Sequence, residues 1–210
     1  DGFTLRDCVT YNEKNNIANG EENRDGEEHN QSWNCGLTCE DDGESCDPEI
    51  CSLRDRQMRN FMVALFVAQG VPMLYMGDEY GHTKCGNNNT YCHDNWMNWV
   101  NWDEANDPLA GEGLARFVRQ LTTLRKDNSA FRLPAFPTAE NIQWHGHTPG
   151  VPLWEEDSRF VAFTLQDTTE SPKFYVAFNA HHEPAFVKLP TPPEGQRWKL
   201  VLDTLSLIHI

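Results

Sequence analysis

The sequence predicts an α/β segment, one slice of a βα-repeat architecture, followed by a small antiparallel β domain. Two observations predict the first part: a helix over 48–69 leads directly into a short apolar strand, and a second helix follows a long polar loop. The third observation is a change near residue 130, where prolines punctuate the chain and short β-rich runs begin. We therefore place the domain boundary near 129–135.

The first predicted helix has clear start and stop signals. Asp47 is a good N-cap, Pro48 suits the first helical position, and Gly70 follows as a stop. The last half of this helix, 61–68, is apolar all round, so we expect it to be deeply covered. The apolar run 71–76 then predicts a strand of a parallel sheet, because such strands are buried on both faces.

The remaining elements are predicted by hydrophobic spacing and turn residues. The segment 4–46 is expected to be a long polar loop with one helical turn near 5–11. A second helix over 114–127 has apolar side chains on one face and basic side chains on the other. The β-rich runs, separated by turn clusters as in a small sandwich, are 159–165, 174–179, 185–189 and 198–202.

The charge of the chain excludes some classes of partner. The 210 residues include 17 basic and 32 acidic side chains, a formal net charge of −15. This acidity argues against nucleic acid, which is bound through Lys and Arg contacts to phosphate, and against an anionic membrane surface. The longest apolar run, 61–68, is far too short for a membrane span. The chain starts with Asp rather than Met, so we expect a fragment, in which a missing targeting segment says nothing about location.

Seven cysteines, an odd number, exclude a complete internal disulfide framework. Four of them lie in 35–51 with the spacing Cys-x3-Cys-x6-Cys-x4-Cys, whereas zinc ribbons usually pair their ligands as Cys-x2-Cys. A metal site, a disulfide between two of the four and reduced thiols all stay open, and we favour reduced thiols. We expect no metal and no cofactor.

Candidate functional residues gather in the loop 77–108, at the carboxyl end of the predicted strand, where βα folds place functional side chains. Asn and Asp side chains interleaved with Trp and Tyr suit a neutral polyhydroxylated ligand. Sugar hydroxyls pair with amides and carboxylates, while the ring face packs on an aromatic side chain. The alternative is that Asn and Asp build turns and the tryptophans are packing anchors.

Two further pairs of residues in this loop are candidates for acid/base chemistry. Asp78 and Glu79 are adjacent carboxylates, but neighbours on a strand point to opposite faces, so we expect one of them to brace the loop. His82 and His93 have no clear partner spacing, and we expect both to be hydrogen-bonded loop histidines.

Longer motifs indicate a family. The segments DGFTLRD (1–7), NGEENRDGEEHNQSWNCG (19–36), RQMRNFMVALFVAQGVPMLYMGDEYGHTK (56–84) and GNNNTYCHDN (86–95) resemble isoamylase-type starch and glycogen debranching enzymes. These belong to the α-amylase superfamily, glycoside hydrolase family 13. The sequences GHTK and TYCH within the last two segments resemble the plant and algal subgroup.

The resemblance implies a fold. The chain is expected to supply the C-terminal part of a (β/α)8 TIM barrel over 1–130, from the end of strand seven to helix eight. A small antiparallel β-sandwich domain, expected to be incomplete, follows over 131–210. In this interpretation 48–69 is helix seven, 71–76 is strand eight and 114–127 is helix eight.

The resemblance also implies an activity. The family hydrolyses α-1,6 branch linkages of glycogen- and amylopectin-type glucans with retention of configuration, by means of an Asp nucleophile and a Glu acid/base. Both lie upstream of this chain, so the chain itself is expected to be inactive. Asp1 matches the family's third carboxylate, which is implied to bind hydroxyls of the distorted sugar more strongly in the transition state. Asp78 and Glu79 are expected to support the loop from behind. The residues predicted to line the glucan cleft are Asn87, Asn88, Asn89, Tyr91 and Asp94.

The implied partners are a branched α-glucan and, as a further candidate, an isoamylase-like subunit, and the implied location is the plastid. The alternative function is a non-catalytic glucan-binding or regulatory isoamylase-like subunit, whose upstream carboxylates would be altered.

Three departures from the family pattern stand out. Cys85 replaces a usual Gly, 37–47 carry a Cys-rich insertion, and 205–210 are suspected not to be native sequence.

Overall fold

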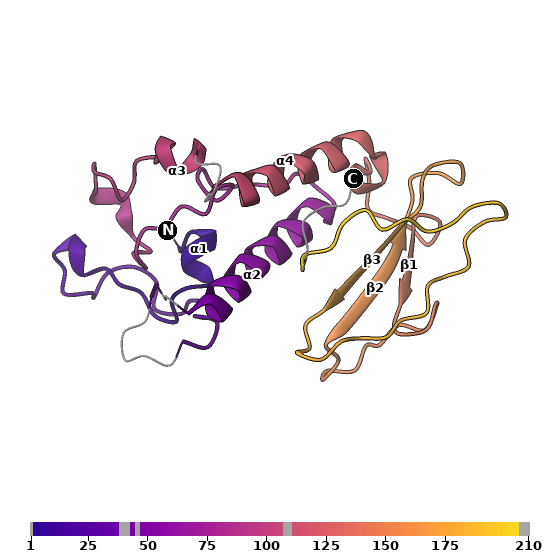
Figure 1. The fold of residues 1–210 in the computed structure, drawn as a ribbon, viewed down its shortest axis with the longest axis horizontal. Helices are drawn as coiled ribbons and strands as arrows, with labels where there is room; N and C mark the ends of the chain where they lie inside the picture. The colour runs from indigo at the N-terminus through magenta and orange to yellow at the C-terminus, as the bar shows by residue number, and fades with distance from the viewer. Residues whose placement is uncertain (1, 38–42, 45–46, 107–110, 206–210) are drawn as a thin grey trace. The chain divides into compact units, whose positions relative to one another are not determined.

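A computed structural model describes residues 2–37, 43–44, 47–106 and 111–205 (Figure 1). The chain divides into two compact units. Unit 1 comprises 1–65, 72–122 and 202–210, and unit 2 comprises 66–71 and 123–201. No helix among the described residues is long and apolar enough to cross a bilayer.

Unit 1 contains short helices in its loops and most of two long ones. The predicted turn near 5–11 is confirmed as α1 (Leu5–Cys8), whose first turn is capped by the Thr4 hydroxyl, which accepts from Asp7 N–H at 3.1 Å. Two 3-10 helices (Ile17–Asn19 and Thr90–Cys92) and α3 (Trp102–Asn106) lie in segments that we predicted as loops.

The two long helices are α2 (Pro48–Val67) and α4 (Gly111–Asp127), and both confirm the predicted elements. Asp47 caps α2 as predicted, with its carboxylate accepting from Glu49 N–H at 2.8 Å. The Cβ position of Gly81 lies 3.8 Å from Met58 of α2 and from Leu114 of α4, so these helix faces meet over one loop.

The second half of α2 is less covered than we predicted. Met62, Val63 and Phe66 are buried, but Phe61 is half exposed. The apolar stripe of α4, by contrast, is buried as predicted, and Phe117 has no exposed surface. The end of α2 that is apolar all round therefore buries only one of its faces within this chain.

The predicted strand 71–76 is wrong for this structure, which assigns no strand there. Val71 is 96% exposed and Met73 is 87% exposed. A parallel strand is held by hydrogen bonds to neighbouring strands, and the strands of the described residues, β1, β2 and β3, are all paired among themselves. The apolar run thus joins no sheet among the described residues, although its composition predicts one.

Unit 2 is built on a three-stranded antiparallel sheet in the order β1-β2-β3 (Figure 1). The predicted strands 159–165 and 174–179 are confirmed as β2 (Phe160–Leu165) and β3 (Phe174–Asn179). Strand β1 (Ile142–His145), which we did not predict, pairs with β2 so that Trp144 lies opposite Phe163.

One face of the sheet packs on the segment that leads into it. Ala130 and Phe131, in a 3-10 helix (Ser129–Arg132), form a buried core with Leu165, and the rings of Phe131 and Phe174 lie 4.6 Å apart. Burial of such apolar surface is the main favourable term in the stability of a small sheet.

The predicted strands 185–189 and 198–202 are wrong, because the structure assigns no strand to either run. Trp198 packs edge-on against Tyr175 and donates its indole N–H to the carbonyl of Pro190 at 2.7 Å. In the run 185–189, Lys188 N–H donates a hydrogen bond to the carbonyl of His147, two residues after the end of β1, at 2.9 Å.

Candidate functional site

The loop 77–101, which follows the run 71–76, is held against α1 by a buried carboxylate. Asp7 is fully buried, and its two oxygens accept from the Thr83 hydroxyl at 2.6 Å and from Lys84 N–H at 2.9 Å. Burial raises the pKa of Asp7, and the hydrogen bonds act in the opposite direction. These contacts join two parts of the chain that are more than 70 residues apart in sequence.

Asp78 and Glu79, the adjacent carboxylates, bind different backbone groups. Asp78 Oδ1 accepts from Leu5 N–H, the first residue of α1, at 2.9 Å, and Glu79 Oε2 accepts from Gly77 N–H at 2.8 Å. Burial raises the pKa of Asp78 as well. The two carboxylates therefore do not converge on one centre.

The side chains of Asn16 and Asn88 form a buried pair at the middle of the loop. Asn88 Oδ1 accepts from Asn16 Nδ2 at 2.9 Å, and the backbone N–H of Asn88 donates to Asn16 Oδ1 at 3.0 Å. Asn88 Nδ2 donates to the carbonyl of Glu27 at 2.9 Å and to Asn30 Oδ1 at 3.0 Å. Asn88 is 1% exposed, so its amide is used for contacts inside the protein.

A second polar cluster surrounds Asn19. Asn19 Oδ1 lies 2.7 Å from both Asn87 Nδ2 and His93 Nε2, and Asn19 Nδ2 donates to Asp25 Oδ2 at 2.6 Å. Asn89 Nδ2 donates to the same oxygen of Asp25 at 2.8 Å. The hydrogen bonds from Asn19 and Asn89 lower the pKa of Asp25, because they favour the ionised form.

Two glycines connect the Asn16–Asn88 pair to the rest of the unit. Gly2 N–H donates to the carbonyl of Asn88 at 2.9 Å. Gly26 has a φ of +78°, and a Cβ there would overlap Asn16 Nδ2 and Asn88 Oδ1. Asp1, the predicted catalytic residue, lies outside the described residues, but its neighbour Gly2 is bound directly to the asparagine pair.

His82 and Lys84 are buried side chains of the same loop. The ring nitrogens of His82 lie 3.1 Å from the Tyr80 hydroxyl and 3.0 Å from a backbone carbonyl, which confirms a hydrogen-bonded loop histidine. Lys84 Nζ donates to the hydroxyls of Tyr75 and Thr90, both at 2.8 Å, and lies 5.0 Å from the centre of the Tyr75 ring. Both side chains are therefore occupied in holding the loop.

The outer side of the loop carries exposed aromatic rings. Tyr91 is 83% exposed, Trp96 and Trp99 are also mostly exposed, and so is Trp102 at the start of α3. Asp94 is exposed and accepts from Trp99 Nε1 at 2.9 Å, which holds a carboxylate beside an aromatic ring. This combination can bind hydroxyls through the carboxylate and a sugar ring face through the indole.

The structure thus separates the predicted cleft residues into two groups. Asn87, Asn88 and Asn89 are joined within the polar clusters of the loop, whereas Tyr91 and Asp94 lie on its exposed side. Sequence reasoning missed the partners from the N-terminal loop, namely Asn16, Asn19 and Asp25. Their only signal was a set of Asn-Asn, Asn-Gly and Asp-Gly dipeptides, which indicate turns.

The unusual cysteine of the loop has a glycine-like backbone. Cys85 has a φ of +54°, in the left-handed region, a conformation that a glycine adopts without strain. Cys35 of the Cys-rich segment has a free thiol, whereas Cys39 and Cys46 lie outside the described residues. Within the described part of the chain, no three metal-binding side chains are placed to hold an ion.

The sequence is similar to known debranching enzymes. A protein-family description named "Isoamylase 1-3, C-terminal" matches residues 143–208. The chain is 55% identical to "Isoamylase SU1, chloroplastic" of Zea mays, over 97% of this chain and 25% of that protein. It is 42% identical to the "Glycogen operon protein GlgX homolog" of Mycobacterium tuberculosis, over 97% of this chain and 31% of that protein. The chain therefore spans about a quarter of the length of the relatives it matches first.

The fold is similar to that of solved pullulanases. The pullulanase of Bacillus acidopullulyticus has a TM-score of 0.59 over 91% of this chain and 19% of that chain, at 20% identity. The apo pullulanase of Paenibacillus barengoltzii has a TM-score of 0.52 over 77% of this chain and 23% of that chain, at 28% identity.

Proposed function

The chain belongs to the isoamylase family, and from this premise we propose that it is the C-terminal part of a glycoside hydrolase that cleaves α-1,6 branch linkages of glycogen- and amylopectin-type glucans with retention of configuration. The observation that carries the proposal is 55% identity to a plant isoamylase across nearly the whole chain. The nucleophile and the acid/base belong to upstream parts of such an enzyme, so the chain alone is inactive.

We further propose that residues 1–130 complete a (β/α)8 barrel and that 131–210 form its C-terminal β domain. In the barrel α2 is helix seven and α4 is helix eight, and the run 71–76, which forms no strand in the structure of this chain, takes the place of strand eight. The exposed side chains of Val71 and Met73 support this assignment, because neighbouring barrel strands would cover the apolar surface that this chain leaves open.

Asp1 is the carboxylate of this chain that acts on the substrate in our proposal. Its carboxylate accepts hydrogen bonds from ring hydroxyls of the distorted sugar, and these hydrogen bonds become stronger in the transition state. The residue that follows Asp1, Gly2, donates its N–H to the carbonyl of Asn88, a member of the buried amide pair. Tyr91 and Asp94 contact the glucan directly, whereas Asn87–Asn89 hold the loop that presents them.

Asp78 and Glu79 keep the supporting role assigned from the sequence. Asp78 supports the start of α1, a few residues after Asp1, and Glu79 closes the turn at Gly77.

The protein acts in the plastid in this proposal, as its plant relatives are described as chloroplastic. Its substrate partner is a branched α-glucan, and an isoamylase-like subunit is the candidate protein partner.

The test compares the full-length enzyme that contains this chain with its Asp1→Ala variant. Hydrogen bonds that strengthen in the transition state are worth several kcal/mol, so we expect kcat on amylopectin to fall by roughly 10²–10⁴-fold while amylopectin binding is retained. An unchanged kcat would refute the role of Asp1. Absence of any hydrolysis by the wild-type enzyme would favour the alternative, a non-catalytic glucan-binding or regulatory subunit.

A further inference from the structure

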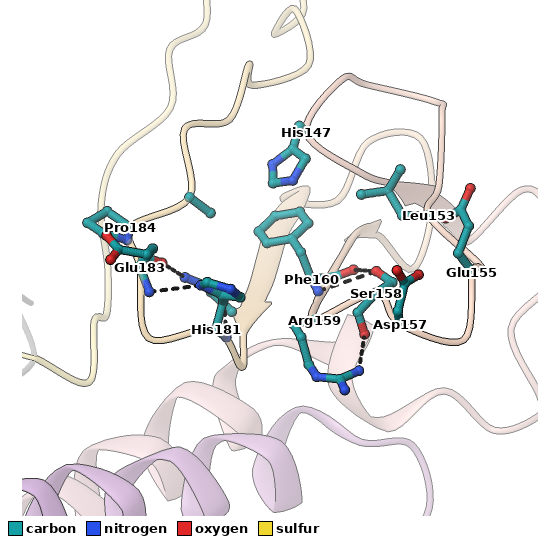
Figure 2. A pocket seen from close by; sticks show the side chains of 12 residues that line it. His147, Leu153, Glu155, Asp157, Ser158, Arg159, Phe160, His181, Glu183 and Pro184 are labelled. Carbon is teal, nitrogen blue, oxygen red and sulfur yellow. Dashed lines mark hydrogen bonds between the residues drawn. The ribbon is translucent and has the colours of Figure 1, made fainter.

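One end of the sheet in unit 2 carries a recess of about 420 Å³, which we name the β-end recess (Figure 2). Three loops form it: 146–153 after β1, 155–159 before β2, and 180–185 after β3. The strands are antiparallel, so these three loops meet at the same end of the sheet. Small-molecule sites have volumes of about 300–1,000 Å³, and this recess falls within that range.

The loop after β1 is anchored by a buried histidine. His145 has 1% exposure; its Nδ1 accepts from Gly150 N–H at 2.8 Å, and its Nε2 lies 3.2 Å from the Thr164 hydroxyl. Burial lowers the pKa of His145, which keeps the ring neutral and able to accept. At Gly146 a Cβ would overlap the backbone of Val151, so the turn is closely packed.

The loop after β3 is anchored to the loop before β2 and to itself. Ala180 N–H donates to the carbonyl of Arg159 at 2.7 Å. Asn179 Nδ2 donates to the carbonyl of Glu183 at 2.9 Å, and Glu183 N–H donates to His181 Nδ1 at 2.9 Å. The walls of the recess are therefore preformed, which reduces the entropy that a ligand must overcome.

The recess contains a flat ring pair. His147 is stacked on Phe160, with ring centres 4.8 Å apart and planes at 21°, and Figure 2 shows His147 above Phe160 with Leu153 beside it. Phe160, the inner ring of this pair, is buried, whereas His147, the outer ring, is exposed. The exposed ring therefore offers a flat face of the kind on which the C–H face of a sugar packs.

Carboxylates lie around the ring pair, and one of them, Glu183, has its Oε1 3.7 Å from the Nε2 atom of His182. Glu155 and Asp157 line one side and Glu183 the other (Figure 2). Among the described residues neither Glu155 nor Asp157 has an ion-pair partner, and Arg159 donates only to backbone carbonyls. Three acidic groups against one guanidinium disfavour a phosphate or another anion. Carboxylates with free lone pairs, together with a guanidinium, suit the hydroxyls of a neutral polyol.

We propose that the β-end recess is a binding site for α-1,4-linked glucan chains. The ring of His147 stacks on one glucose face, and Glu183 and Asp157 accept from hydroxyls of the bound chain. The choice of an α-glucan rests on the proposed function, because a debranching enzyme meets such chains at high local concentration. The recess would hold a linear chain of the polymer while the enzyme acts on a branch.

The test is isothermal titration calorimetry of the 210-residue chain with maltoheptaose, with cellohexaose as the β-linked control. We expect saturable binding of maltoheptaose only. His147→Ala should weaken binding about tenfold, because one stacking contact is worth up to about 1.4 kcal/mol, whereas His147→Phe, which keeps a flat ring, should restore it. Glu183→Gln should weaken binding, and Glu170→Gln, an exposed glutamate outside the recess, should leave it unchanged.

A second measurement uses the full-length enzyme and covers the case in which the chain alone does not fold. There His147→Ala should raise KM for amylopectin about tenfold relative to Glu170→Gln. The proposal would be overturned if His147→Ala and Glu170→Gln had the same affinity for maltoheptaose and the same KM for amylopectin. It would also be overturned if cellohexaose bound as tightly as maltoheptaose. An enzyme that hydrolyses branches without a His147 effect refutes the recess alone. A chain that binds maltoheptaose through His147 while the full-length enzyme hydrolyses nothing refutes the proposed activity alone.

Discussion

Arg125 provides the sharpest test of how the end of α2 is held. Its guanidinium donates to the carbonyls of Phe66 and Ala68, both at 2.7 Å, and to that of Gly70. The last carbonyls of a helix have no partner inside the helix, and here a side chain from α4 supplies one. Arg125 is 7% exposed, so these hydrogen bonds are formed away from water.

The perturbation is Arg125→Met, which keeps the length of the side chain and removes its donors. A hydrogen bond to a charged group contributes about 1.5–3 kcal/mol, but three bonds from one guanidinium are not additive. We therefore expect the free energy of unfolding to fall by about 3 kcal/mol. Removal of the buried charge offsets part of the loss, because burial already lowers the pKa of Arg125.

The assay is urea unfolding of the chain, followed by far-ultraviolet circular dichroism. Arg116→Met is the matched control, since Arg116 lies on the same helix and is exposed. We expect Arg116→Met to change the free energy of unfolding by less than about 0.5 kcal/mol. Equal urea midpoints for the two variants would refute the conclusion that Arg125 closes the end of α2.

Two further predictions concern the loop of unit 1. Gly26→Ala should lower the thermal midpoint more than Gly20→Ala: both glycines have a φ of +78°, so both variants carry the left-handed strain, but only at Gly26 does a Cβ meet Asn16 and Asn88. The same midpoint for both would contradict the close approach. The pKa of Asp7 is raised above 3.8 in the folded state, so just above pH 3.8 the folded protein holds a proton on Asp7 that the unfolded chain has lost. The contribution of Asp7 to the free energy of unfolding therefore falls as the pH rises through this window. Asp7→Asn should flatten this part of the pH profile of unfolding free energy, and an unaltered slope would count against the burial of an ionisable carboxyl.

Local signals in the sequence are sufficient to determine the long helices. Asp47 and Pro48 at the start of α2, and the spacing of Leu114, Phe117 and Leu121 in α4, each involve residues within a few positions of one another. Helix formation depends on such neighbours, so capping and periodicity locate it. The family was determined in the same way, because its motifs are contiguous segments.

Strands were predicted less well, because a strand needs a partner that is distant in sequence. The runs 71–76, 185–189 and 198–202 have β-rich or apolar composition, yet none is paired as a strand here. Strand β1, with Trp144 opposite Phe163, has little local signal and exists because β2 lies beside it. Composition indicates which segments could enter a sheet, and tertiary structure decides which of them do.

The sequence by itself therefore determined the family, the two long helices and the loop in which polar and aromatic residues gather. Only the tertiary structure decided how that loop uses them. Asn16 and Asn88 are 72 residues apart in the chain and form one buried hydrogen-bonded pair, while Tyr91, three residues after Asn88, faces solvent. The physical reason is that a buried amide must find its partners within the fold, and no local pattern records which distant amide will be there.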